Sequence, residues 1–516
     1  MDTEAYFEQP KSFGCLPPLR VPDLELVTRE YLNLNLASPT LSGLCSVRRM
    51  YVKHFVLFVA ATLALALPVS AQRYNIATIP TLGGAASGAS AVNSSGQVAG
   101  TSQVSTQIRH AFIWSKTSAI RDLGTLGGMN SYGVALNDSG QVVGYSETTG
   151  SLHVFLWSAS TGMIDLGSLG TSSFASGINA SGAVMGFFLD SSGQIHAFSW
   201  TQSTGMQDLG FGPNSQPTAI NDAGQIVGNA GYPCVSTGHA YLWSPGHGIQ
   251  NLDFPGAVCT RVYGINNSGQ AVGLYTATAS GPTQGFTWSS GSGFQTLPSL
   301  GGTTEGLFIN ASGQVSGRSV SSVDHTYHAF LWSPTGGIQD VGVPPRSNRA
   351  TYPVGLNNKG EVVGVVSYAN GSGSLFRFDW TPKTPITPIN VVEFSALNDA
   401  GQIIGSRGPG PNFQSAVLLS PRVNVILSAT PNPSKFGKSV TFTAKAKSFL
   451  GAPPDGEMVK FQEGATVLGM APLTGGVAKF TTTGLSVGTH AVTATYVGDV
   501  HYDPSVSNVF NQVVNP

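Results

Sequence analysis

One eight-residue motif recurs through most of this chain and limits what it can fold into. The motif is Asn-x-x-Gly-x-x-x-Gly, and successive copies begin 41 to 47 residues apart. Its eight copies begin at Asn93, Asn137, Asn179, Asn221, Asn266, Asn310, Asn357 and Asn398. A near-constant period of this size is typical of repeat architectures, in which each unit packs on its neighbours.

Two further elements recur between the motif copies. One is an apolar stretch that ends in tryptophan, and all seven tryptophans of the chain occupy this place. Five of these stretches begin with histidine, at His110, His153, His196, His239 and His328. The other element, Asp-Leu-Gly, begins at Asp122, Asp165 and Asp208. Each unit therefore predicts four short antiparallel strands, with an Asn-to-Gly turn after the first.

Four strands in roughly 43 residues are the size of a propeller blade. A β-solenoid and a string of separate small domains are the alternatives. Solenoid repeats are usually shorter, and isolated units of this size are marginally stable. The eighth unit lacks a fourth strand, whereas an unpartnered strand begins at Tyr74. The sequence thus predicts an all-β fold in which residues 72–421 form an eight-bladed β-propeller closed by an N-terminal strand.

The motifs HAFLW, DLGTLGG and IN-x-x-GQVVG resemble those of the HAF-type bacterial extracellular repeat proteins. The resemblance covers residues 73–421. It implies secretion, and it implies no established reaction or ligand.

The pattern changes over residues 422–516, where alternating apolar and polar stretches are separated by turns. Seven such strands in about 95 residues predict a C-terminal β-sandwich. The sequence THAVTATYVGDVHYDPSVS is similar to bacterial Ig-like repeats of surface proteins, but it lacks Cys and Trp. This second resemblance implies a spacer or adhesive module.

The only long apolar run of the chain, Phe55 to Val69, follows several basic residues and is followed by Ser70 and Ala71. This order predicts a signal peptide over residues 50–71, cleaved after Ala71. The alternative is a membrane anchor, for which fifteen residues are short of the roughly 20 required. We interpret residues 1–49 as an over-extended start and expect them to be disordered. The protein is expected to be secreted or held at the cell surface, without a membrane span after signal removal.

Charge argues against a nucleic-acid partner. Only 10% of the residues are charged, the net charge is −1, and no basic block is present. Binding to nucleic acid requires a positive stripe that neutralises phosphates.

The residues give no catalytic, metal-binding or cofactor-binding constellation. Equivalent histidines would stand around a ring, too far apart to share one ion. A His–Asp hydrogen bond that locks each blade, as between His110 and Asp122, is the simpler interpretation. The chain has no GxSxG, HExxH or phosphate loop. We therefore expect no cofactor and no enzymatic activity. The alternative is an extracellular carbohydrate-active hydrolase or lyase whose acids, such as Asp190, Glu305 and Asp324, converge.

Segments between the second and third strands differ in every unit. Because recognition is usually carried by varied loops on a rigid scaffold, we predict a binding scaffold for an extracellular glycan or protein. Unconstrained drift of these loops is the alternative. The predicted ligand contacts are Tyr145, Phe187, Tyr232, Tyr275, Asp324 and Tyr327. Cys234 and Cys259 are predicted to form a disulfide, because an exported chain folds under oxidising conditions.

Overall fold

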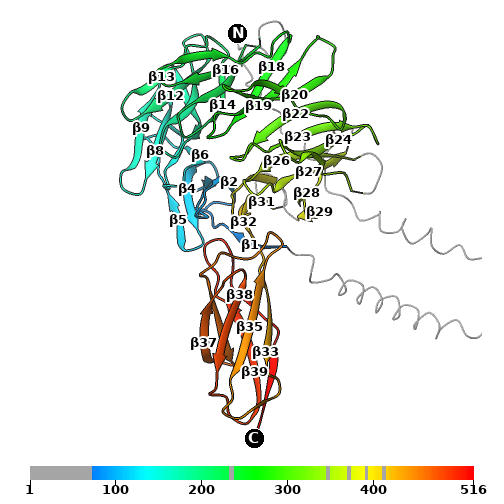
Figure 1. Ribbon diagram of the computed structural model, residues 1–516. Helices are drawn as coiled ribbons and strands as arrows, with labels where there is room; N and C mark the ends of the chain where they lie inside the picture. Colours follow the sequence, from blue (N-terminus) through cyan, green and yellow to red (C-terminus); the bar gives the residue numbers. More distant parts are fainter. Residues whose placement is uncertain (1–72, 232–237, 345–348, 369–373, 390–392, 409–413) are drawn as a thin grey trace, which may run out of the picture. The chain divides into compact units, whose positions relative to one another are not determined.

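The computed structural model describes residues 73–231, 238–344, 349–368, 374–389, 393–408 and 414–516. In these ranges every regular element is a β-strand (Figure 1). The described part of the chain contains no helix able to cross a membrane.

The first 32 strands form eight antiparallel sheets of four strands within the described residues. Seven sheets take four consecutive strands each. These seven are β2 (Ser87–Val92), β3 (Val98–Gln103), β4 (Arg109–Ser115) and β5 (Ser118–Asp122); β6 (Ser131–Leu136), β7 (Val142–Glu147), β8 (Leu152–Ser158) and β9 (Gly162–Gly167); β10 (Ser172–Ile178), β11 (Val184–Leu189), β12 (Ile195–Thr201) and β13 (Gly205–Asp208); β14 (Gln216–Ile220), β15 (Ile226–Ala230), β16 (His239–Ser244) and β17 (Gly248–Asn251); β18 (Cys259–Ile265), β19 (Ala271–Thr276), β20 (Thr283–Ser289) and β21 (Gly293–Thr296); β22 (Gly301–Ile309), β23 (Val315–Ser321), β24 (Tyr327–Ser333) and β25 (Gly337–Asp340); and β26 (Arg349–Leu356), β27 (Val362–Tyr368), β28 (Ser374–Thr381) and β29 (Thr384–Ile389).

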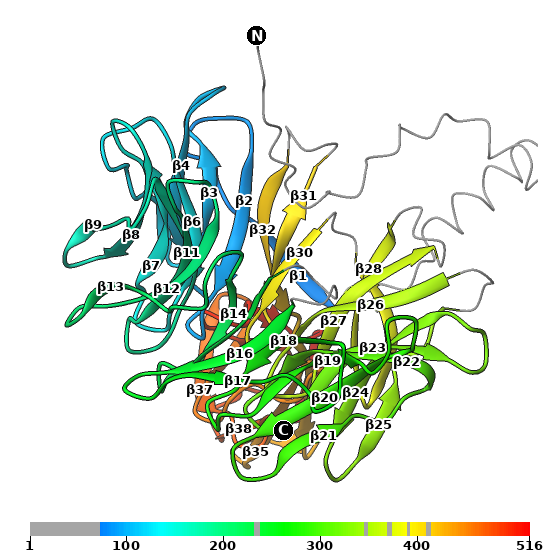
Figure 2. The same ribbon diagram turned by 90° about the horizontal axis from the view of Figure 1, so that it is seen from above.

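The eighth sheet combines both ends of this region. Its strands are β30 (Glu393–Leu397), β31 (Ile403–Arg407), β32 (Ser415–Pro421) and β1 (Tyr74–Thr78). Strand β1 pairs antiparallel with β32, from Tyr74 opposite Pro421 to Thr78 opposite Val417. In Figure 2 the sheets follow one another in chain order around a ring, giving a propeller-like arrangement. First strands such as β2, β14 and β18 lie nearer its middle than fourth strands such as β9, β13 and β25.

The motif asparagines link neighbouring sheets. Each buried Asn donates a side-chain Nδ2 hydrogen bond to the backbone carbonyl of the next motif Asn, at 2.9 to 3.1 Å. The last bond runs from Asn398 back to Asn93, across 305 residues of sequence. We call this cycle of eight bonds the Asn ring. The Asn Oδ1 atom also accepts the backbone N–H four residues later, as in the bond from Gln97 to Asn93 at 2.9 Å.

The two glycines of the motif meet different needs. The first has a positive φ in every copy, for example 75° at Gly140, a conformation that disfavours other residues. The second lies under the carbonyl of the adjacent first strand. A Cβ at Gly144 would overlap the Tyr132 carbonyl oxygen and the ring of Phe155, which is fully buried. The aromatic side chain of the third strand therefore fills the space that this glycine leaves open.

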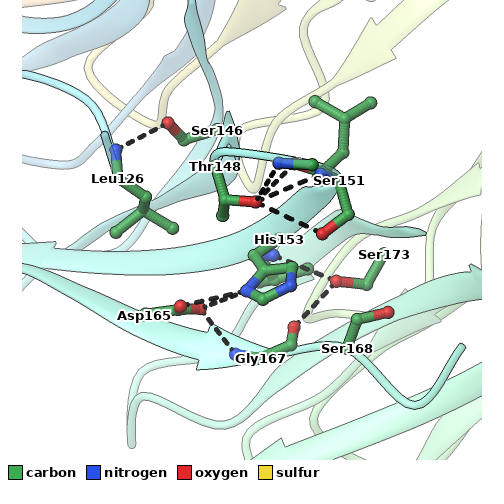
Figure 3. Close-up of polar contacts among 12 residues, drawn as sticks. Leu126, Ser146, Thr148, Ser151, His153, Asp165, Gly167, Ser168 and Ser173 are labelled. Carbon is green, nitrogen blue, oxygen red and sulfur yellow. Dashed lines mark hydrogen bonds and ion pairs between the residues drawn. The ribbon is translucent and has the colours of Figure 1, made fainter. Parts of the chain in front are cut away.

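Histidine and aspartate join the third and fourth strands in several sheets, as the sequence predicted. In the second sheet, Nδ1 of His153 lies 2.9 Å from Asp165 Oδ2, and Asp165 Oδ1 accepts the Gly167 N–H at 2.8 Å (Figure 3). This second bond explains the glycine of the Asp-Leu-Gly element. His110 and Asp122 repeat the arrangement at 2.8 Å in the first sheet. The third sheet departs from the prediction, because Nδ1 of His196 is 3.8 Å from Asp208 and makes no hydrogen bond to it.

Residues beyond Arg422 form two further sheets. One contains β33 (Asn424–Thr430), β35 (Val440–Lys447) and β38 (Val477–Thr482). The other contains β34 (Ser434–Lys435), β36 (Met458–Glu463), β37 (Thr466–Pro472), β39 (Gly488–Tyr496), β40 (Ser505–Val506) and β41 (Phe510–Asn515). Buried residues of both sheets share one core, in which the rings of Phe442 and Phe461 lie 6.4 Å apart. This part is the predicted β-sandwich.

Candidate functional site

Each four-stranded sheet has one cross-strand pair of residues whose identity changes from sheet to sheet. The pair joins the residue five positions before the motif Asn to the residue after the second motif Gly. We call these the variable pairs: Gly88 and Thr101, Tyr132 and Tyr145, Phe174 and Phe187, Gln216 and Asn229, Arg261 and Leu274, Glu305 and Arg318, Tyr352 and Val365, and Glu393 and Ser406.

The position just before each first-strand member is uniform by comparison. It is Ser or Thr in the seven sheets whose residue there is described. In five of them its hydroxyl accepts a backbone N–H from the preceding sheet; these are Ser87, Ser131, Ser173, Ser215 and Thr351. The Ala111 N–H, for example, donates to Ser131 Oγ at 2.9 Å. Thr304 instead bonds to Gly302 and Ser319 of its own sheet, and Thr260 accepts from Phe254 in the segment that precedes its strand. Residues that hold the sheets together thus repeat, whereas the variable pairs beside them do not.

Four half-buried aromatic residues of the second and third sheets form a continuous stack. The rings of Tyr132 and Tyr145 lie 4.9 Å apart and nearly parallel. Tyr145 then meets Phe174 edge-on at 5.1 Å, and Phe174 stacks on Phe187 at 5.0 Å. We call these four residues the aromatic ladder. Burial raises the pKa of Tyr145, so its hydroxyl stays protonated and can donate a hydrogen bond.

A charged group surrounded by tyrosines lies in the sixth sheet. The Arg318 guanidinium donates to Glu305 from Nε at 2.9 Å and from Nη2 at 3.0 Å. It also lies 4.9 Å from the ring centre of Tyr327 and 5.5 Å from that of Tyr352 in the next sheet. The side chain of Arg318 is 34% exposed. We call these four residues the Arg318 cluster, which presents a paired cation and two aromatic rings.

Beside Tyr327, one imidazole lies between two carboxylates. Nδ1 of His328 is 2.9 Å from Asp340, and its Nε2 is 3.0 Å from Asp324. Burial lowers the pKa of His328, but the hydrogen bonds to Asp340 and Asp324 outweigh it and leave this pKa raised. Partial burial raises the pKa of Asp324, but the hydrogen bonds from His328 and Thr326 and the charge of His328 together outweigh it and leave this pKa lowered. The arrangement favours an imidazolium that donates from both nitrogens.

The structure places the predicted contact residues differently from the sequence interpretation. Tyr145 and Phe187 were expected in loops, but they lie within β7 and β11 because both strands continue past the second motif glycine. Asp324 does lie in a loop, and Tyr327 is the first residue of β24. Tyr232 lies outside the described residues.

The structure corrects the prediction that Tyr275 is a ligand contact, because this residue is buried. It lies in β19, is 7% exposed and stacks on Phe254 at 3.6 Å. Its hydroxyl is 2.5 Å from Gln284 Oε1 and 3.0 Å from Thr296 Oγ1. Gln284 and Thr296 occupy the positions of the His–Asp pair in other sheets, so Tyr275 bridges the two strands where that pair is missing.

The acids considered for an enzymatic alternative are each held by their own neighbours. Asp190 accepts hydrogen bonds from Ser192 and Gln194, and the bond from the Ser192 hydroxyl is the main reason that its pKa is lowered to about 2. Glu305 is paired with Arg318, and Asp324 with His328. Asp190 belongs to the third sheet, whereas the other two belong to the sixth. No group of three His, Cys, Asp or Glu within the described ranges is arranged to hold a metal.

The cysteine prediction is only partly visible. Cys259 is buried at the start of β18 and is disulfide-bonded. Cys234 lies outside the described residues, so the pairing of these two cysteines stays a prediction.

Sequence reasoning missed the β-bulge that lies beside every variable pair. Each first strand shifts register against its second strand three residues before the motif Asn, as between Gly133 and Ala135. A bulge re-aims neighbouring side chains. The sequence marks this bulge by one feature, the uniform spacing of six residues between the buried Ser or Thr and the motif Asn.

Comparisons with known proteins bear on the C-terminal part first. Residues 427–515 match the bacterial Ig-like domain (group 3). The prediction of an Ig-like domain is therefore confirmed for this segment. A search of curated proteins found no match to the chain.

Solved structures give only distant likenesses. One is dipeptidyl peptidase 4 of Porphyromonas gingivalis, 10% identical over 71% of this chain and 65% of the other, with a TM-score of 0.46. Another is TolB of Acinetobacter baumannii, 11% identical over 48% of this chain and 65% of the other, with a TM-score of 0.29. The matched parts thus make up just under two thirds of each of these proteins.

Proposed function

We propose that this protein is an exported, non-catalytic binding scaffold. It consists of an eight-bladed β-propeller of HAF-type repeats, closed by β1, and an Ig-like domain that acts as a spacer or adhesive module. The aromatic ladder and the Arg318 cluster contribute the binding surface. The ligand is an extracellular glycan or protein.

Two observations support the closed propeller. The Asn ring returns from Asn398 to Asn93, which gives the last sheet a bond to the first. Strand β1 supplies the fourth strand of the sheet that would otherwise end at β32. With β1 in place, β32 is paired on both sides instead of forming the sheet edge, and exposed edges invite aggregation.

The observation that carries the binding proposal is the contrast between the two ends of the first strands. At the end of the first strand that carries the motif, every motif Asn makes the same hydrogen bonds. At the variable pairs, the side chains are half-buried aromatics in two sheets and a tyrosine-flanked Arg–Glu pair in another. Aromatic faces of this kind bind sugar rings and protein side chains. A scaffold in which the contacts between sheets repeat while the variable pairs differ is suited to recognition.

Export is supported by the order of basic, apolar and small residues before Ala71. N-terminal sequencing of the secreted protein should find Gln72 first. A secreted protein that still begins before Met50 would contradict this part of the proposal.

The experiment is a screen of the labelled chain on arrays of extracellular glycans and proteins. A double variant, Tyr145→Ala with Phe187→Ala, should lose binding because it breaks the aromatic ladder. Ile249→Ala removes an exposed apolar side chain from the outermost strand of another sheet and serves as the matched control. Full binding by the folded double variant, or no ligand for the intact chain, would reject the proposal.

A further inference from the structure

A second candidate site lies between the first two sheets of the β2 to β9 region. It is a cavity of about 240 Å³ near the Asn-to-Gly turns, at the end of the strands opposite the variable pairs. The residues that line it include Arg121, the largely buried Trp114 and Trp157, and the polar residues Gln97, Ser118 and Ser139.

Arg121 gives this cavity its charge. Its guanidinium lies 4.9 Å from the ring centre of Trp157, and its side chain is exposed. Among the described residues, no carboxylate lies within ion-pair distance of Arg121, whereas Arg318 is fully paired with Glu305. The equivalent fourth-strand residues of the next two sheets are Ile164 and Gln207, so this cation is absent from those repeats.

The volume limits what can enter. An apolar cavity of about 150 Å³ binds benzene, and pockets for drug-sized ligands begin at about 300 Å³. A space of about 240 Å³ therefore suits a single ring with a few substituents.

We infer that this cavity binds one acidic sugar residue, a pyranose ring that carries a carboxylate. Three properties of the wall match three properties of such a ring. The small exposed parts of the two indoles contact the apolar C–H groups, the hydroxyls of Ser118 and Ser139 and the amide of Gln97 meet the ring hydroxyls, and Arg121 pairs with the carboxylate. An aromatic carboxylate would leave the polar groups unused, and a neutral sugar would leave Arg121 unpaired.

The inference uses residues separate from the aromatic ladder and the Arg318 cluster. It does not depend on whether those surfaces bind a ligand. The inference and the proposed function can therefore fail independently.

The test measures binding of trigalacturonic acid to the full chain by calorimetry and by tryptophan fluorescence, because two indoles line the cavity. Arg121→Gln removes the charge, and Ala159→Phe fills the cavity from an exposed position on its rim. Arg109→Gln is the matched control, since this arginine is exposed on the same sheet and lies at the other end of β4.

We expect both cavity variants to weaken binding at least tenfold and Arg109→Gln to change it less than twofold. Binding should weaken as salt is raised, because the ion pair is partly exposed. The neutral trisaccharide of galactose should bind at least tenfold more weakly than the acidic one. No binding of trigalacturonic acid at millimolar concentration, unchanged binding by folded Arg121→Gln, or equal binding of the neutral sugar would overturn the inference.

Discussion

Glu361 lies four residues after a motif Asn, at a position where the other seven copies have Gln or Ala. Replacing this acid is a sharp test of the structure. Its side chain is fully buried, and it accepts hydrogen bonds from Asn357 Nδ2 at 2.8 Å and from the Tyr74 hydroxyl at 2.9 Å. Burial, aided by the charge of Asp379, raises the pKa of Glu361 to about 7. We predict that Glu361→Gln stabilises the protein at pH 8.

The magnitude follows from proton linkage. The folded state holds the proton up to about pH 7, whereas the unfolded chain releases it near 4.5. The stabilising contribution of protonated Glu361 is thus fully present below pH 4.5 and is lost as the pH rises through about 7. At about 1.4 kcal/mol for each pH unit, the loss is about 3 kcal/mol by pH 8. Glutamine has nearly the same planar shape as the neutral acid, and the Tyr74 hydroxyl can accept from its Nε2.

The assay is urea unfolding of the full chain at pH 4.5 and pH 8, followed by tryptophan fluorescence. All seven tryptophans lie between residues 114 and 380, so this signal reports the four-stranded sheets. Variant and unmodified protein should agree at pH 4.5, and the variant should be more stable at pH 8. Gln314→Glu, at the same place in a partly exposed site, should show a smaller pH dependence. Equal stability of Glu361→Gln and the unmodified protein at pH 8 would refute the reasoning.

Three further predictions test other contacts. Asn221→Asp replaces two N–H donors with acceptors that face the Gln225 and Asn266 oxygens, and should cost about 2 to 6 kcal/mol in urea unfolding. Gly144→Ala forces a Cβ into a backbone carbonyl and should cost at least about 2 kcal/mol, seen as a lower melting temperature. The pKa of His328, followed by NMR, should lie above 6.5. Its contribution to stability is therefore present below pH 6.5 and is lost as the pH rises through the raised pKa of the folded state. Asp324→Asn should lower this pKa. An unchanged His328 titration in Asp324→Asn would show that the carboxylate does not act on it.

The sequence was most informative where a repeated residue has a single physical task. The motif Asn predicted a turn at the end of the first strand, because Asn and Gly supply turn geometry locally. It did not predict the Asn ring, since a side-chain bond to a residue more than 40 positions away depends on how sheets pack. His110 and Asp122 were predicted as a pair because they flank one hairpin.

The candidate site was harder to predict. Tyr145 and Tyr275 follow second motif glycines at neighbouring positions, and adjacent strand residues point to opposite faces. Tyr145 therefore joins the aromatic ladder, whereas Tyr275 enters the core beside Phe254. Which face is open depends on the bulge and on the next sheet, neither of which a single repeat reveals.

The closed ring of eight sheets is the claim on which the binding surface depends. Hydrogen exchange tests it directly, in the intact chain and in a chain that lacks residues 74–84. Loss of β1 leaves β32 as an exposed edge, so amides of β32 that bond to β1 should exchange at least tenfold faster, and β2 of the neighbouring sheet should also exchange faster. Unchanged exchange in both strands would contradict the closed ring.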